Sequence, residues 1–237
     1  MGNKKLQRFE AIHSFSNVLQ YPEGMRGKWK GFFKNENPIT LELACGKGEY
    51  TVGLSALHPE RNFIGVDLKG NRIYSGALEC LKNNLSNAAF LRTQIDKIDT
   101  YFLPAEVSEI WITFPDPHLR TSHAKKRLTH PRFLRLYQSI LQPGGLVHLK
   151  TDSPELFHFT KFMADLYDLD IQDVSENVHA RTDNSPEINI TTHYEKLDIA
   201  DSKQVYYLRF SLPEKQIPLT DPKLQELLKQ IENTELL

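Results

Sequence analysis

Apolar and polar positions alternate along the chain with two different periods. Short apolar runs predict buried strands at 39–43, 62–67, 88–91, 109–113 and 146–150. Apolar positions with helical spacing lie between the first three strands, at 49–57 and 70–83, and again at 131–141. This alternation predicts a parallel sheet with helices on both of its faces.

The pattern changes after residue 152. Ser153 and Pro154 predict the start of a helix, as N-cap and first helical residue, that runs to about Tyr167. Two further strands are predicted at 170–178 and 204–211, with a long polar loop between them. The prediction is therefore an α/β fold whose seven-stranded, mostly parallel sheet ends in an antiparallel pair.

The size of the chain fits one main domain with two appendages. With 237 residues and 40% hydrophobic content, it can bury one large core. We expect an N-terminal basic appendage at 1–37, a main domain at 38–211 and a helical tail at 212–237. The tail should hold a short amphipathic helix from about 222 to 232.

The sequence predicts a cytoplasmic protein. Cys45 and Cys80 are too few for a disulfide framework. No stretch of the sequence approaches the roughly 18 consecutive apolar residues of a membrane span, and the N-terminus has no continuous apolar segment of the signal-peptide kind. Neither a membrane partner nor a metal site is expected, since no Cys/His cluster has the spacing of metal ligands. The sequence leaves open whether the protein is a monomer or a homodimer.

Positive charge is concentrated in two segments. The formal net charge is only -1, so binding to a nucleic acid would depend on local charge. The first 34 residues carry seven Lys or Arg against two acids, and residues 118–135 carry six and no acid. Each segment fits a surface for a polyanion, but also a solvated face without a ligand.

The run Phe114-Pro115-Asp116-Pro117 lies between the apolar strand at 109–113 and the second basic segment. In open α/β folds, ligands bind at the carboxyl ends of the strands, which is where this run places Asp116. Proline fixes its own φ and biases the preceding residue away from helix, so Asp116 should lie on a stiff turn. We therefore expect a functional carboxylate beside a site for a polyanion.

A second candidate site follows the first strand of the main domain. Gly46 and Gly48 form a turn that leads directly into the helix at 49–57, where the backbone can approach a ligand closely. The third glycine of the dinucleotide fingerprint is missing, and Glu42 would repel a pyrophosphate. S-adenosylmethionine (SAM), a cation without phosphates, fits better than NAD. Asp67, which closes the second strand, is placed to accept ribose hydroxyls.

Together these motifs resemble the bacterial tRNA (guanine-N7-)-methyltransferases over most of residues 5–211. The resemblance rests on residues 42–50, 65–67, 114–117, 125–129, 150–152 and 192–195. It implies a Rossmann-like class I methyltransferase fold and transfer of a methyl group from SAM to N7 of guanine 46 in the tRNA variable loop. The proline-bracketed acid and the late Thr192-His193-Tyr194-Glu195 are the most specific parts.

The resemblance also implies roles for individual residues. The SAM pocket would be lined by Glu42, Gly46, Gly48, Asp67, Gln94 and Asp116. Asp116 would be the central active-site acid, and the substrate contacts would be Arg120, Asp152, Thr192 and Glu195. The residues that meet RNA would be Ser122, His123, Lys125, Lys126 and Arg127. Lys4, Lys5 and Arg8 would add phosphate contacts from a flexible N-terminus.

Some positions depart from the commonest family pattern. His118-Leu119-Arg120-Thr121 stands where that pattern has Trp-Pro-Lys-Lys, Gln94 where it has Asp or Asn, and Ala44 where it has Gly.

The expected chemistry needs no base, because guanine N7 already has a free lone pair in the ring plane. Alignment and electrostatics would therefore dominate, with Asp116 holding guanine and offsetting the charge that develops on its ring. Three alternatives stay open at this point: an RNA-binding module without activity, a NAD-dependent enzyme, and a SAM-dependent methyltransferase for another RNA, a protein or a small molecule.

Overall fold

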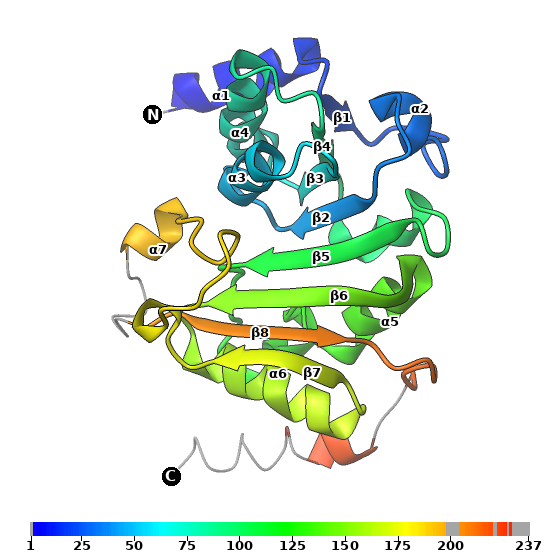
Figure 1. Ribbon diagram of the computed structural model, residues 1–237, viewed down its shortest axis with the longest axis vertical. Helices are drawn as coiled ribbons and strands as arrows, with labels where there is room; N and C mark the ends of the chain where they lie inside the picture. The colour runs from blue at the N-terminus through cyan, green and yellow to red at the C-terminus, as the bar shows by residue number, and fades with distance from the viewer. Residues whose placement is uncertain (1, 198–203, 220–221, 227, 229–237) are drawn as a thin grey trace.

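The computed structural model describes residues 2–197, 204–219, 222–226 and 228. Its strands form one sheet in the order β1-β4-β3-β2-β5-β6-β8-β7 (Figure 1). Their bounds are β1 (Val18–Gln20), β2 (Ile39–Leu43), β3 (Asn62–Asp67), β4 (Ala88–Arg92), β5 (Val107–Thr113), β6 (Leu141–Thr151), β7 (Asp170–Ser175) and β8 (Tyr206–Ser211). The first six pair in parallel, and β8 is antiparallel to both β6 and β7. The predicted mostly parallel sheet with an antiparallel edge is confirmed.

The predicted number of seven strands is wrong, because the sheet has eight. The additional strand, β1, lies within the segment expected to be an appendage and pairs with β4. It spans three residues, all of them half-buried. A strand this short, without an alternating apolar pattern, gives too weak a signal to detect from sequence.

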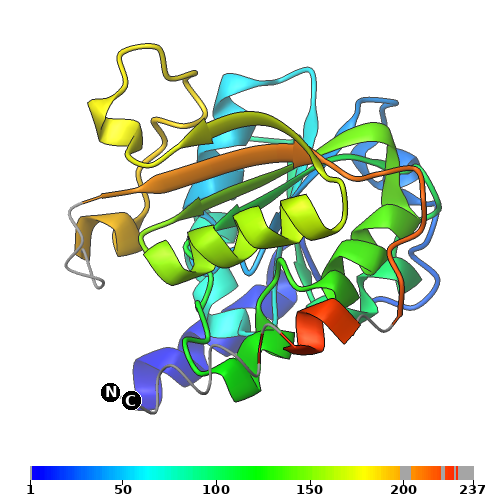
Figure 2. The same ribbon diagram turned by 90° about the horizontal axis from the view of Figure 1, so that it is seen from below.

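Successive residues of the central strands face opposite sides of the sheet. Ile110 and Ile112 of β5 join the larger core, which also contains residues of α2 (Trp29–Phe33), α5 (Pro131–Ile140) and α6 (Pro154–Leu166). Trp111 faces the other side and packs against Tyr50 of α3 (Glu49–Leu57). Helix α4 (Gly70–Lys82) packs on β3 and β4 beside α3. Figure 2 shows α6 lying along one face of the sheet.

The N-terminal segment is a packed helix, in contrast to the flexible segment expected from sequence. Helix α1 (Gly2–Ala11) contacts α4, as Figure 1 also shows. A Cβ atom on Gly70, the first residue of α4, would lie 2.6 Å from Cδ1 of Ile12 and 3.0 Å from Phe9. The Arg92 guanidinium lies 4.7 Å from the centroid of the Phe9 ring. These contacts fix the start of the chain beside the N-terminus of α4.

The C-terminal segment also contributes to the core. Ile217 and Leu224 are both buried in the larger cluster, and residues 222–226 and 228 are helical. The predicted end of this helix near residue 232 lies outside the described residues. The predicted domain boundaries, after 37 and after 211, stay predictions. None of the helices in the described part of the chain is long and apolar enough to span a membrane.

Polar side chains occupy the second face of the sheet over β5, β6 and β8. Glu109 pairs with Arg61 and lies 3.1 Å from Nε2 of His148. The Tyr207 hydroxyl lies 2.7 Å from Nδ1 of His148. Burial alone would raise the pKa of Glu109, but the His148 hydrogen bond and the Arg61 charge lower it to about 2. A buried carboxylate thus stays ionised next to Trp111, which donates to it and packs in one cluster with Val178 and Ile188.

Two glycines in helices should respond in opposite ways to alanine. A Cβ on Gly76 of α4 would lie 2.6 Å from the Lys47 carbonyl oxygen, whereas a Cβ on Gly31 of α2 would meet nothing within 4 Å. Gly76→Ala should therefore lower the free energy of unfolding by about 1–3 kcal/mol, and Gly31→Ala should raise it by about 0.5–1 kcal/mol. Urea denaturation of both variants checks this. An equal stabilisation by both would contradict the close approach at Gly76.

Candidate active site

A cavity of about 640 Å³ opens at the carboxyl ends of β2, β3, β5 and β6. The sequence predicted a site at this edge of the sheet. Its walls come from the strand ends, the turn after β2, the Phe114–Pro117 turn, the start of α6 and the segment before α7 (His193–Leu197). The lining residues are Glu42, Ala44, Cys45, Glu49, Asp67, Lys69, Arg72, Thr113, Phe114, Pro115, Asp116, Pro117, Leu119, Asp152, Ser153, Pro154, Glu155 and Thr192.

Glu42 connects three elements at the base of this cavity. Its carboxylate accepts hydrogen bonds from the Thr51 backbone N–H at 2.7 Å and the Thr51 hydroxyl at 2.6 Å. It also accepts one from the Thr113 hydroxyl at 3.0 Å. The N-cap of α3 is Gly48, which has no side chain to accept from the first turn. Glu42 supplies that acceptor from β2 and ties the start of α3 to the ends of β2 and β5.

Burial determines the protonation of Glu42. Its side chain is removed from water, and this raises its pKa from 4.5 to about 7, although the Thr51 and Thr113 hydrogen bonds act in the opposite direction. Cys45, in the same turn, has a pKa raised well above its usual range by burial and by Glu42 and Asp67. This favours packing over nucleophilic chemistry for Cys45.

Asp67 holds the glycine turn from the neighbouring strand. Its carboxylate accepts a hydrogen bond from the Gly46 N–H at 2.9 Å and another from the Lys69 N–H at 2.7 Å. The turn is left-handed at Gly46 and Gly48 and also at Ala44, with φ of 57°, 73° and 56°. Ala44 thus takes a conformation that costs an alanine about 1 kcal/mol, at the position where the family pattern has glycine.

The Phe114–Pro117 turn is framed by two residues in unusual conformations. Phe114 and His118 both have a φ of 46°, so Phe114 lies outside the right-handed helical region, in a conformation that non-glycine residues rarely adopt. The Asp116 side chain is 74% exposed at the cavity and accepts a hydrogen bond from the His118 N–H at 3.0 Å. Non-glycine residues with positive φ persist only where their surroundings hold them in place, and they are concentrated at functional sites.

Arg127 provides that support, although the sequence predicted that it binds RNA. Its guanidinium donates to the carbonyl oxygens of Pro117, His118 and Leu119 at 3.2–3.3 Å. It also lies 4.6 Å from the centroid of the Phe159 ring, and only 6% of the residue is exposed. Arg127 is therefore not placed to contact RNA phosphates, because its donors already serve the turn that carries Asp116.

The other predicted residues fall into three groups. Asp152 and Thr192 line the cavity together with Glu42, Asp67 and Asp116, and Gly46 and Gly48 shape the turn beside it. The side chains of Arg120, Ser122, Lys125 and Lys126 are exposed on or next to the short helix η3 (Thr121–Lys126), and His123 is half-buried there. Gln94 and Glu195 are not among the lining residues: Gln94 is exposed at the start of the helix at 95–100, and Glu195 pairs with Lys150.

Sequence reasoning gave no role to Lys150, and it missed the two threonines that bind Glu42. Lys150 is 1% exposed at the end of β6, and a lysine inside an apolar strand is the signal that could have identified it. Thr51 and Thr113 gave no comparable signal, because threonine is common in helices and strands that have no ligand. The His130 ring caps α5 by accepting a hydrogen bond from the Arg132 N–H.

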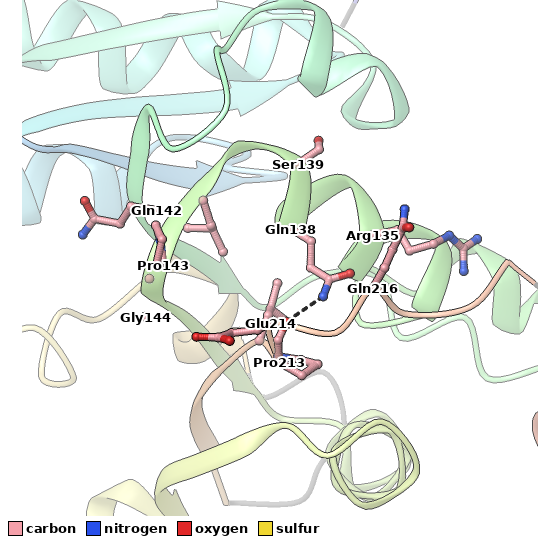
Figure 3. Close-up of a pocket in the computed structure, with 12 residues that line it drawn as sticks. Arg135, Gln138, Ser139, Gln142, Pro143, Gly144, Pro213, Glu214 and Gln216 are labelled. Atoms are coloured by element: carbon pink, nitrogen blue, oxygen red, sulfur yellow. Dashed lines mark hydrogen bonds between the residues drawn. The ribbon is translucent and has the colours of Figure 1, made fainter.

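A second cavity, of about 470 Å³, lies at the opposite end of β6 (Figure 3). Its lining includes Gly144, Glu214 and Arg135, and none of the residues predicted to be functional. Gln138 closes one side by donating to the Pro213 carbonyl oxygen at 2.8 Å. Of these two cavities, only the first is lined by residues that were predicted to be functional.

Comparison with known proteins agrees with the motifs at this site. A family model described as "Putative methyltransferase" matches residues 36–208. The tRNA (guanine-N(7)-)-methyltransferase of Bacteroides fragilis is 43% identical over 90% of this chain and 88% of its own length. The tRNA (guanine-N(7)-)-methyltransferase of Porphyromonas gingivalis is 42% identical over 90% of this chain and 92% of its own length. The chain belongs to the tRNA (guanine-N7-)-methyltransferase family. The predicted family resemblance is confirmed.

Solved structures with much lower sequence identity share the fold of this chain. The 16S rRNA methyltransferase KamB has a TM-score of 0.58 at 13% identity and covers 78% of this chain and 93% of its own. The 16S rRNA (adenine(1408)-N(1))-methyltransferase of Catenulisporales acidiphilia has a TM-score of 0.57 at 16% identity, covering 79% and 93%. A variant of the latter, with a TM-score of 0.52, was solved with its cosubstrate SAM. The predicted Rossmann-like class I methyltransferase fold is confirmed.

The raised pKa of Glu42 predicts a pH-dependent stability. The folded protein holds the Glu42 proton up to pH of about 7, and the unfolded chain only to about 4.5. This group therefore stabilises the fold at low pH, and about 3 kcal/mol of that contribution is lost as the pH rises from 4.5 to 7. Glu42→Gln removes the titration. The difference in unfolding free energy between wild type and Glu42→Gln should change by about this amount between pH 5 and 8, measured by urea denaturation without ligand. A constant difference would contradict the raised pKa.

Proposed function

We propose that this protein transfers a methyl group from SAM to N7 of guanine 46 in the variable loop of tRNA. The observation that carries the proposal is one cavity lined by Glu42, Asp67 and Asp116, whose lining residue Leu119 lies just before η3 and its exposed lysines. The names of its relatives support the same substrate. An enzyme that modifies tRNA would act in the cytoplasm.

The donor set of the cavity fits SAM. Glu42, Asp67 and Asp116 all line the cavity with carboxyl groups, which favours a cationic ligand over one that carries phosphates. The left-handed turn at Gly46 and Gly48 brings backbone close to the cavity without Cβ atoms. When bound, SAM supplies an activated methyl group on its sulfonium sulfur. Glu42 and Asp67 would hold the cofactor. The ionised carboxylate of Glu42 would stabilise the positive charge of SAM more than the protonated form would.

Asp116 is the residue best placed for the guanine. Its exposed carboxylate can accept hydrogen bonds from the N1 and N2 donors of guanine, and Asp152 and Thr192 line the same cavity. As N7 forms its bond to the methyl carbon, the carbon–sulfur bond breaks and the guanine ring becomes cationic. A fixed carboxylate stabilises that charge. No residue needs to remove a proton before attack.

The exposed cations of η3 would bind the tRNA backbone. Lys125 and Lys126 point to solvent, and Arg120 precedes them on the same loop. Contacts of this kind supply affinity and orientation without reading sequence. Arg8 and Lys4 on α1, packed beside α4, would extend the basic surface. Guanine N7 is enclosed in folded tRNA, so we expect the base to leave its stack when it enters the cavity.

The decisive test combines the protein with labelled SAM and unmodified tRNA, followed by borohydride and aniline cleavage at methylated guanines. We expect one labelled site, guanine 46.

Asp116→Asn should lower kcat by about a hundredfold or more while SAM still binds, because the fixed charge is lost but the pocket remains. Label in a small molecule, in another RNA or nowhere would exclude the proposal, and full activity of Asp116→Asn would remove Asp116 from the reaction.

The two lysines of η3 should determine the salt dependence of tRNA binding. Lys125→Gln with Lys126→Gln should lower the slope of log K against log salt by about 2, one for each lost phosphate contact. Lys82→Gln with Lys215→Gln, two exposed lysines outside η3 and the cavity, is the matched control. Arg127→Met should leave the slope unchanged and reduce kcat. An equal slope in the lysine variants and wild type would mean that η3 is only a solvated face.

A further inference from the structure

Lys150 is a buried lysine whose three donor hydrogens all have acceptors. The residue is 1% exposed at the end of β6. Its Nζ lies 2.8 Å from the Ile188 carbonyl oxygen, 3.0 Å from that of Ile190 and 2.9 Å from Oε2 of Glu195. An ammonium group has three N–H donors, so this set satisfies it completely. Burial lowers the pKa of Lys150, and the Glu195 carboxylate opposes that shift.

All three acceptors belong to one segment, residues 188–195. Most of this segment has no strand partner, so its buried carbonyl groups need donors from elsewhere. Lys150 supplies two of them from the sheet. The side chain of Ile190 also packs closely on α3, since a Cβ on Gly53 would lie 2.9 Å from its Cδ1. The 188–195 segment is therefore held between β6 and α3.

The 188–195 segment forms part of the cavity wall. Thr192 lies between Ile190 and Glu195, is 4% exposed and lines the cavity. Its hydroxyl accepts from the Glu195 N–H at 3.1 Å, so the placement of one residue depends on the other. Lys150 also stands two residues before Asp152, which lines the same cavity. One strand end thus carries Asp152 directly and fixes Thr192 through a lysine.

We propose that Lys150 is a positioning residue that sets the place of Thr192 in the active site, with Glu195 as its counter-ion and not a ligand of the substrate. The effect on methyl transfer rests on the proposed function. The effect on the 188–195 segment can be measured on the protein without tRNA. The geometry favours it because the Glu195 carboxylate is 5% exposed, is not among the residues that line the cavity and lies 3.3 Å from His179 on its other oxygen.

The first measurement is hydrogen exchange of the amides in 188–195, without SAM or tRNA. Lys150→Met should raise their exchange rates about tenfold or more, while peptides of β5 and α4 keep wild-type rates. Lys150→Gln retains two donor hydrogens, so its exchange rates should lie between those of wild type and Lys150→Met. If Lys150→Met does not fold, Lys150→Gln takes its place in the measurement. Lys82→Met, at an exposed lysine of α4, is the matched control. Unchanged exchange in 188–195 would overturn the positioning role, whether or not the protein methylates tRNA.

The second measurement is a double-mutant cycle on methyl transfer. If Glu195 acts only through Lys150, then Lys150→Met combined with Glu195→Leu should lose no more kcat/KM than the more damaging single variant. The loss should fall mainly on kcat, because a displaced Thr192 misaligns the substrate. Multiplied losses in the double variant would show a separate contact of Glu195 with the substrate and overturn its assignment as a counter-ion.

Discussion

The hydrogen bonds of one buried carboxylate, Glu42, tie together the parts of the molecule on which the site depends. They join the end of β2 to the first turn of α3 through Thr51 and to the end of β5 through Thr113. The glycine turn lies between β2 and α3, and the Asp116 turn directly follows β5. An uncharged hydrogen-bond acceptor at position 42 could also place the glycine turn and the Asp116 turn at one cavity. A carboxylate gives stronger bonds and a negative charge, at the cost of keeping a group with a raised pKa out of water.

Two buried cations organise the irregular parts of the cavity wall in the same way. Arg127 donates to three carbonyl groups of the loop after Pro115, and Lys150 donates to two carbonyl groups and a carboxylate of the 188–195 segment. Irregular backbone cannot satisfy its own buried carbonyl groups, as helices and sheets do. A long cationic side chain that starts from a neighbouring segment reaches several of them at once. Side chains of the type that binds nucleic acid thus hold the protein's own backbone.

Sequence reasoning predicted the fold, and it named five of the residues that line the cavity, for physical reasons that can be named. Strands β2 and β3 and helix α3 have the predicted bounds, because their apolar patterns are continuous and turn residues separate them: Gly46 and Gly48 before α3, and Pro59 after it. Glu42, Asp67 and Asp116 could be placed together at one cavity from sequence because the carboxyl ends of parallel strands meet at one edge. The assignment of Arg127 to RNA failed because charge in a sequence says nothing about burial. Strand β1 and the role of Lys150 depend on tertiary contacts that no local pattern records.

The position of β8 has a consequence for synthesis of the chain. Strand β8 lies between β6 and β7, although it is the last strand to be made. Until residues 206–211 have left the ribosome, β6 and β7 each present an unpaired edge, and unpaired edges invite association with other chains. The sheet, and with it the segment that Lys150 binds, can close only when the final strand inserts. Nascent chains that stop before residue 206 should therefore be the form of this protein most exposed to aggregation and most in need of chaperones.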